Sequence, residues 1–378
     1  MPAFSFRHVK DLYPIFWSKS CHLVRNLGAE ITEKMSSDPS KPFAVVEIAN
    51  WASRATLDII GVAGLGKDFN ALDDPETELN RTYRSVLQPN RVAQYLAFLS
   101  LVVPQQIVQA LPFAHNNNIV EGSKAIKRVA RQLIQDKKEK MRVEGKRRDV
   151  DILSVSIESG GFSDEDMVNQ LMTFLAAGHE TTATALTWAI YLLCKHPKIQ
   201  SRLREDIRAT LPSPDAEQDL SDSALDSCTY LHAVCSEVLR LYAPVPITLR
   251  EAAKDTSLAG HFIPKGTAVM ICVWAINTST AMWGSDAKEF NPDRWIGPGR
   301  AGSGGAESNY AFLTFLHGPR SCIGQQFAKA EFACLVAALV GRFDFELEDD
   351  KMEIRVKGGI TARPKDGLKV KMKALEGW

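Results

Sequence analysis

A cysteine stands just before an apolar helical run in the last quarter of the chain. Residues 315–324 read Phe-Leu-His-Gly-Pro-Arg-Ser-Cys-Ile-Gly, and the apolar run 327–339 comes directly after them. Free backbone N–H groups and the helix dipole favour negative charge at the start of a helix. We therefore predict that the pKa of the Cys322 thiol is lowered toward the thiolate, the form that binds metals or attacks electrophiles.

The residues around Cys322 suit a flat ligand. Gly318 and Gly324 permit tight turns and a close approach of the backbone, and Arg320 can pair with an anionic group. One thiolate beside an arginine fits a planar, carboxylate-bearing metal cofactor such as haem. The alternative is that Cys322 is a small buried apolar residue ahead of a core helix.

A second candidate site interrupts the longest helical pattern, residues 164–194. Residues 176–182 read Ala-Ala-Gly-His-Glu-Thr-Thr in the middle of this apolar helix. Gly178 costs about 1 kcal/mol relative to alanine inside a helix, and the Thr181 hydroxyl can bond a preceding carbonyl and open the turn. The motif has two interpretations: a small pocket for water or a diatomic molecule, or a close-packing seam between helices.

Glu237 and Arg240 lie three residues apart in a predicted helix, residues 231–241, so they share one helix face and can pair. A lone pair of this spacing is by default a surface ion pair, which contributes less than about 1 kcal/mol.

The elements that must position these residues are mostly helices. Helical spacing of apolar residues extends over 7–36, 80–111, 119–148 and the two helices already named. Alternation predicts short strands at 268–273 and 343–347 and a hairpin over 360–370. We therefore expect a mainly α-helical fold with small β-sheets, of the α+β class.

Composition excludes several classes of protein. Among 378 residues, 45 lysines and arginines balance 45 aspartates and glutamates, which argues against a nucleic-acid binder. Seven cysteines include no Cys-x-x-Cys pair, so a disulfide framework or zinc site is not expected. The sequence has no run of eighteen apolar residues, the length typical of a transmembrane helix.

Four stretches together resemble the cytochrome P450 family. They are Phe-x-x-Gly-x-Arg-x-Cys-x-Gly at 315–324, Ala-Gly-x-Glu-Thr-Thr at 177–182, Glu-x-x-Arg at 237–240 and Phe-Asn-Pro-Asp-Arg-Trp at 290–295. They occur in the family's order, and the resemblance covers essentially the whole chain. It implies one cytochrome P450 domain over residues 1–378 that holds haem b.

The resemblance also implies roles for the residues of the Cys loop and of the distal helix. Cys322 is implied to be the axial ligand of the haem iron. Thr181 is implied to assist protonation during oxygen activation, Glu180 to belong to the proton-delivery path, and Gly178 to leave room over the iron. The other implied haem contacts are Phe315, Gly318, Arg320, Gly324 and Arg250, and for Arg250 an ordinary surface arginine is the alternative.

The resemblance implies two further groups of residues. Arg294 is implied to join Glu237 and Arg240 in a buried Arg–Glu–Arg group that holds the loop of Cys322 and serves haem incorporation. The substrate pocket is implied to be apolar and to include Phe174, Ala177, Val245, Ile247 and Ile360.

The beginning of the chain departs from the family pattern. Eukaryotic members start with a membrane anchor, a first β-sheet and several helices, one of which carries a Trp-x-x-x-Arg that contacts a haem propionate. Residues 1–30 resemble the part of the family fold that comes after that helix, and only two residues separate Trp51 from Arg54. We therefore expect an N-terminally truncated version of the fold, which retains haem weakly.

The resemblance implies a haem-thiolate monooxygenase that inserts one oxygen atom from O2 into an apolar small molecule. Electrons would come from a separate NADPH-dependent reductase, and we expect a monomer that binds no nucleic acid. The style of the relatives suggests fungal secondary metabolism, at the endoplasmic reticulum membrane for a full-length relative. Two alternatives are an oxygen-independent rearrangement of a peroxide, and a truncated remnant that is not an enzyme.

Overall fold

The computed structural model describes residues 2–38, 40–77, 114–144, 150–216, 220–351, 354–357 and 360–378, with residues 81, 99, 103 and 107. The helices expected over 80–111 otherwise lie outside the described residues. The longer helices are α2 (Tyr13–Ser37), α3 (Ile48–Ile59), α7 (Ala114–Glu144), α9 (Asp164–Lys195), α10 (Pro197–Thr210), α12 (Thr229–Leu241) and α15 (Gln325–Arg342). The shorter ones are α1 (Phe6–Lys10), α8 (Ile152–Glu158), α11 (Asp222–Ser227), α13 (Val273–Asn277) and α14 (Thr280–Trp283), with the π-helical turn η2 (Ile60–Gly64) and the 3₁₀ turns η1 (Pro2–Phe4), η3 (Pro292–Trp295), η4 (Asn309–Ala311) and η5 (Gly318–Arg320).

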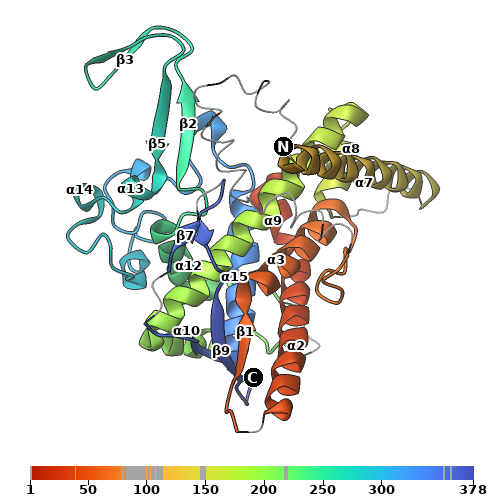
Figure 1. The fold of residues 1–378 in the computed structure, drawn as a ribbon, viewed down its shortest axis with the longest axis vertical. Helices are drawn as coiled ribbons and strands as arrows, with labels where there is room; N and C mark the ends of the chain where they lie inside the picture. The colour runs from red at the N-terminus through yellow and green to blue at the C-terminus, as the bar shows by residue number, and fades with distance from the viewer. Residues whose placement is uncertain are drawn as a thin grey trace.

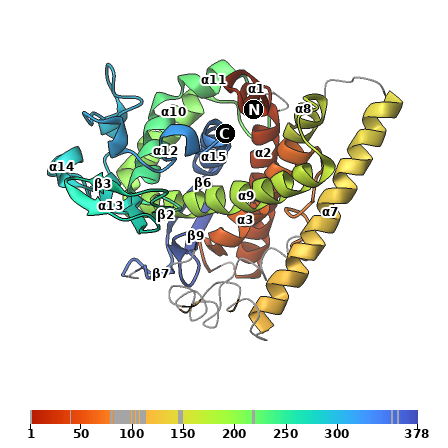
Figure 2. The ribbon, with the colours of Figure 1, turned by 90° about the horizontal axis from the view of Figure 1, so that it is seen from above.

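Helix α9 runs through the middle of the molecule and packs against α3, α7, α12 and α15, and α15 in turn packs against α2 (Figure 1 and Figure 2). The Ser163 hydroxyl accepts the N–H of Asp166 at 3.2 Å and caps the helix, and three acidic residues fill its first turn. Pro197 follows its end. Its second half is buried almost without interruption, so α9 is the helix around which the core packs.

The described strands form small antiparallel sheets at the edges of the helical body. Strand β9 (Lys369–Ala374) lies between β1 (Ala44–Glu47) and β6 (Phe343–Leu347), with Val370 opposite Val46 and Leu347. Strands β2 (Ile247–Glu251) and β5 (Ala268–Cys272) form a ribbon that projects from the body, with β3 (Thr256–Leu258) and β4 (His261–Ile263) at its tip (Figure 1). A fourth pair joins β7 (Val356–Lys357) to β8 (Arg363–Pro364).

The predicted mixture of helices and small sheets is confirmed, and one strand assignment is wrong. Residues 360–370 do not form a hairpin with one another, because β8 pairs with β7 and the last strand pairs with β1 and β6. Val370 and Met372 of β9 are fully buried by that second pairing. Among the described helices, none is both long and apolar enough to cross a membrane.

Glu331 of α15 is a fully buried carboxyl whose two oxygens have no hydrogen-bond partner among the described residues. Burial raises its pKa well above the ordinary value, and the nearby Thr182 side chain lowers it by less. The carboxyl therefore keeps its proton to a higher pH in the folded chain than in the unfolded chain, so its contribution to stability falls as pH rises above about 4.5 toward the folded-state pKa.

We expect Glu331→Gln to gain stability relative to the natural chain as pH rises from 5 to 8, by up to about 1.4 kcal/mol for each pH unit. Urea unfolding at several pH values measures the difference. Glu346→Gln, an exposed position on β6, is the control and should show no such trend. A difference between natural chain and Glu331→Gln that is constant with pH would contradict a protonated Glu331.

Candidate active site

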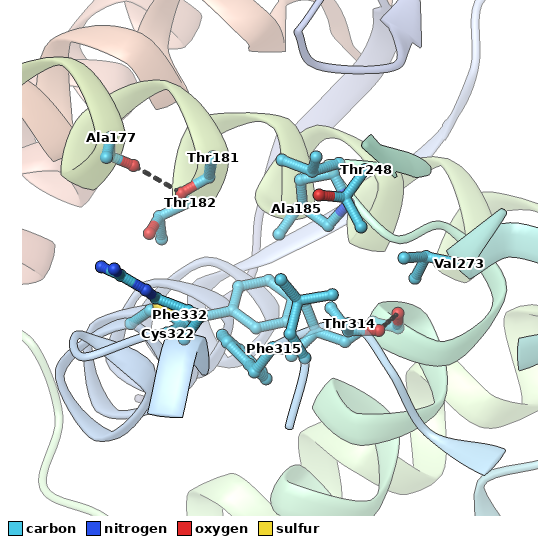
Figure 3. Close-up of a pocket in the computed structure, with 16 residues that line it drawn as sticks. Ala177, Thr181, Thr182, Ala185, Thr248, Val273, Thr314, Phe315, Cys322 and Phe332 are labelled. Carbon is cyan, nitrogen blue, oxygen red and sulfur yellow. Dashed lines mark hydrogen bonds between the residues drawn. The ribbon is translucent and has the colours of Figure 1, made fainter. Parts of the chain in front are cut away.

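A cavity of about 270 Å³ lies between α9 and the loop that precedes α15. Figure 3 shows Ala177, Thr181 and Thr182 on α9 along one wall, with Phe315, Cys322 and Phe332 along the opposite wall. Thr248 and Val273 lie at one end. The remaining lining residues are Ala185, Leu239, Pro244, Val245, Thr314, Leu316, Arg320 and Ala328. Two of the sequence motifs, 177–182 and 315–324, therefore meet across one cavity.

The loop that carries Cys322 is closed by its own backbone. The Cys322 N–H donates to the Phe315 carbonyl at 2.8 Å, and between them Gly318 has a φ of +80°, a conformation that favours glycine. Leu316, which also lines the cavity, has a φ of +58° although it is not a glycine. The loop thus presents an accessible Cys322 just ahead of α15, as the sequence predicts.

The predicted direction of the Cys322 pKa is wrong for the chain without a bound ligand. Although Cys322 is exposed, the protein atoms around its sulfur partly desolvate the thiol and raise its pKa above the ordinary value, and the backbone N–H of Gly324 lowers it by less. A helix start alone therefore does not produce the thiolate in this setting. A metal cation at the thiol would stabilise it.

The two arginines that the resemblance implies as haem contacts differ in position. Arg320 lines the cavity, and the described residues give its guanidinium no hydrogen bond or ion pair. Arg250 on β2 is exposed and does not line the cavity; its Nη1 donates to the Thr248 hydroxyl at 3.0 Å and to the Leu249 carbonyl at 2.8 Å. Because Thr248 lines the cavity, Arg250 lies at its edge.

In the distal motif, the hydroxyl of Thr181 faces the cavity and donates to the Ala177 carbonyl at 2.8 Å (Figure 3). The role implied for Gly178 needs correction. A Cβ at Gly178 would lie 3.1 Å from Cδ1 of Ile60, so the missing side chain permits close packing of α9 against η2. The close-packing interpretation therefore applies to Gly178, and the pocket interpretation applies to Thr181.

Glu180 does not line the cavity. Its Oε1 accepts hydrogen bonds from the guanidinium of Arg363, the first residue of β8, at 2.9 Å and from the hydroxyl of Thr361, just before that strand, at 3.3 Å. Burial raises the pKa of Glu180, and the charge of Arg363 and the hydrogen bond from Thr361 lower it by less. The acid beside Thr181 is therefore fixed to the C-terminal part of the chain.

The Arg–Glu–Arg group is assembled in the core. Arg240 binds both carboxylate oxygens of Glu237 at 2.8 Å, and Nε of Arg294 donates to the same carboxylate at 3.1 Å. Glu237 and Arg240 have no exposed surface. The indole of Trp295 and the backbone N–H of Asn291 complete the acceptor capacity of the carboxylate. The surface-pair interpretation of Glu237 and Arg240 is therefore wrong.

Sequence reasoning missed Asn277, which connects this group to the Cys loop. Its Nδ2 donates to the Arg240 carbonyl at 3.1 Å and to the Thr314 hydroxyl at 2.8 Å, while its Oδ1 accepts the Leu313 N–H at 2.8 Å. Thr314 in turn donates to the Leu239 carbonyl at 2.7 Å. A single asparagine at the end of the short helix α13 carries no motif that would have identified it.

The structure gathers only part of the predicted substrate pocket. Ala177 and Val245 line the cavity of Cys322. Phe174 instead packs edge-on against Phe4, with ring centroids 5.2 Å apart, and Ile360 is 80% exposed. Ile247 lines a separate cavity, together with Trp188 and Tyr242. Successive side chains of a strand point to opposite faces, and Thr248, the next residue, is the one that points toward the cavity of Cys322.

The residues that are present fit haem. The donor set is one accessible thiol, and an arginine without a protein partner among the described residues lines the same cavity. The small side chains of Ala177 and Ala185 stand on the wall opposite the thiol, which leaves the space between the walls open.

Comparisons with known proteins agree with this geometry. The family model described as cytochrome P450 matches residues 1–372. The cytochrome P450 monooxygenase sphH of Aspergillus fumigatus is 48% identical over all of this chain, which spans 69% of that protein. The monooxygenases FUM15 of Gibberella moniliformis and ALT8 of Alternaria alternata are 42% and 41% identical, over 99% and 100% of this chain and 70% and 72% of their own lengths. The chain therefore belongs to the cytochrome P450 family of haem-thiolate enzymes.

Proposed function

We propose that the chain is a monooxygenase that inserts one oxygen atom from O2 into an apolar small molecule. The observation that carries this proposal is the meeting of Cys322 and Thr181 across one cavity, a thiol on one wall and a hydroxyl on the other. Relatives at 41–48% identity that bear the name cytochrome P450 monooxygenase support it.

Cys322 would hold the iron of haem b, and Arg320 would pair with a propionate. Haem bound through a thiolate supplies oxygen activation, because the thiolate pushes electron density that favours O–O cleavage. Phe315, Gly318 and Gly324 shape the loop around Cys322. The Arg–Glu–Arg group and Asn277 keep that loop in place through Leu313 and Thr314.

Thr181 would manage protons at the cavity. Its hydroxyl proton points to the Ala177 carbonyl, so passing a proton into the cavity requires the hydroxyl to turn and to take up another proton from water. Glu180 is the adjacent acid on α9, and its raised pKa suits a group that holds a proton closer to neutral pH. We assign it to the proton-delivery path, with Arg363 as its fixed partner.

An apolar substrate is expected from the lining of the cavity. Leu239, Val245, Val273, Leu316 and Phe332 provide apolar side chains, while the polar side chains in the lining are those of four threonines, Arg320 and Cys322. We further propose a single-domain monomer that takes electrons from an NADPH-dependent reductase. By analogy with its fungal relatives, we propose a place in secondary metabolism, and we assign the endoplasmic reticulum membrane only to a full-length relative.

Replacing Thr181 with alanine is expected to separate oxygen consumption from product formation. Loss of a positioned proton donor typically costs about a hundredfold in rate, so we expect product formation to fall by at least tenfold while NADPH oxidation continues and hydrogen peroxide accumulates. The measurement is peroxide released per NADPH oxidised, with haem-loaded protein and a fungal reductase.

Thr173→Ala is the matched control, because Thr173 lies on the same helix and makes the same bond, to the Asn169 carbonyl at 3.0 Å, at an exposed position. If Thr181→Ala turned over normally and no reductase were needed, the oxygen-independent rearrangement would be the better assignment.

A further inference from the structure

Three consecutive residues, Thr361, Ala362 and Arg363, connect α9 to the wall of the cavity. At one end, Arg363 and Thr361 both donate to the Glu180 carboxylate, at 2.9 and 3.3 Å. The ion pair is largely enclosed, since the Glu180 side chain is 12% exposed and that of Arg363 is 26% exposed. It is therefore better protected from water than the surface pairs of this chain.

The middle residue makes two further bonds through its backbone. The Ala362 carbonyl accepts the indole N–H of Trp188 at 2.8 Å, and the Ala362 N–H donates to the Pro244 carbonyl at 2.8 Å. Trp188 lies about 12 Å along α9 from Glu180, at 1.5 Å per residue. Its ring stacks on the ring of Tyr242, with centroids 4.2 Å apart, and this contact holds the indole in place. The segment is thus attached to α9 at two separate points.

Pro244, the third attachment, belongs to the cavity. Pro244 and Val245 line it directly, at the start of the extended path into β2. The hydrogen bond from the Ala362 N–H to the Pro244 carbonyl joins this extended segment to the C-terminal part of the chain. The position of the cavity wall therefore depends on the position of Ala362.

We propose that residues 361–363 form a latch, anchored by the ion pair between Glu180 and Arg363, which holds the cavity wall at Pro244 and Val245 against α9 and limits the size of molecule that the cavity accepts. Arg363 is then a positioning residue, which acts on the cavity through Ala362 and does not touch the substrate. The latch also explains why an acid at position 180 makes its closest contacts away from the cavity.

The first arm of the test uses the full chain without haem, so it does not depend on the proposed function. In Arg363→Gln and Glu180→Gln we expect amide hydrogen exchange of a peptide containing Ala362 to become at least tenfold faster. Arg355→Gln is the matched control, because Arg355 pairs with Asp366 at 3.0 Å in the same part of the chain with both side chains more than 60% exposed. Exchange within twofold of the natural chain in both latch variants would overturn the latch.

The second arm uses haem-loaded protein and two iron ligands, imidazole and the bulkier 4-phenylimidazole. We expect the ratio of their dissociation constants to change at least fivefold in Arg363→Gln, to be unchanged in Arg355→Gln, and to be restored toward the natural value in Arg363→Lys. A general loss of packing would change the dissociation constants of both ligands by a similar factor and leave their ratio unchanged. An unchanged ratio in Arg363→Gln, despite faster exchange at Ala362, would overturn the role in size selection.

Combining Glu180→Gln with Arg363→Gln distinguishes a pair from two separate contacts. If the two residues act through one another, the double variant exchanges no faster than the faster single variant. Additive acceleration would overturn the assignment of this ion pair as the anchor. A chain that bound no haem would refute the proposed function and leave this test and the first arm intact.

Discussion

Replacing Cys322 with serine is expected to reduce monooxygenation to background. A serine hydroxyl does not ionise near neutral pH, so the variant offers no anionic ligand to iron and no electron density for O–O cleavage. The fold should be unaffected, because Cys322 is accessible and its backbone supplies the loop bond to Phe315. Product formation with reductase and NADPH measures the first effect, and urea unfolding measures the second.

Cys272→Ser is the control for this experiment. Cys272 is also a partly accessible free cysteine, but it lies at the end of β5 and does not line the cavity of Cys322. It should keep the turnover of the natural chain. If Cys322→Ser kept more than a tenth of the natural turnover while folded, Cys322 would not be the ligand on which the chemistry depends.

Glu237→Ala is expected to destabilise the chain by about 3–5 kcal/mol, the range for breaking a buried ion pair by removing one partner. The loss leaves the guanidinium of Arg240 without its buried counter-ion, and also removes an acceptor from Arg294, Trp295 and Asn291. Because Asn277 joins Arg240 to Thr314, the Cys loop should loosen as well. The free energy of unfolding in urea, and the haem bound per chain, measure the two effects.

The pair between Arg202 and Asp293 provides the contrast. Its atoms are 2.8 Å apart, as close as those of the buried pair, but both side chains are more than half exposed. Asp293→Asn should therefore cost less than about 1 kcal/mol. A cost of similar size for Glu237→Ala would mean that the buried group does not stabilise the loop.

The parts of the site that sequence predicts best are those with fixed local spacing. Cys322 stands ahead of its helix because glycines and a helix start are local features, and Thr181 faces the cavity because the helical period sets its direction. The joining of Arg294 to Glu237 is a long-range contact, which only the family resemblance made predictable. Strand β1 was not predicted, since its four residues are defined by pairing with β9 at the other end of the chain.

The features of the site that the sequence did not predict depend on tertiary packing. Gly178 looked like space over a ligand, yet its missing side chain faces Ile60 from a different helix. Whether Ile247 or Thr248 points toward the cavity depends on the residue at which β2 begins. Two prolines just before the strand make that starting residue hard to predict from the sequence. Arg363 and Asn277 act through long-range hydrogen bonds that leave no local pattern in the sequence.

The most direct test of the central claim, that Cys322 and the opposing wall of α9 form a haem-thiolate site, is the absorption spectrum of the reduced, carbon monoxide-bound protein. The natural chain, titrated with haemin, is expected to develop the thiolate-type Soret band, whatever the fraction of haem it retains on dilution. Cys322→Ser should bind haem without that band or not at all. A natural chain that saturates with haemin and shows no thiolate-type band, or a Cys322→Ser variant that shows one, would contradict the account.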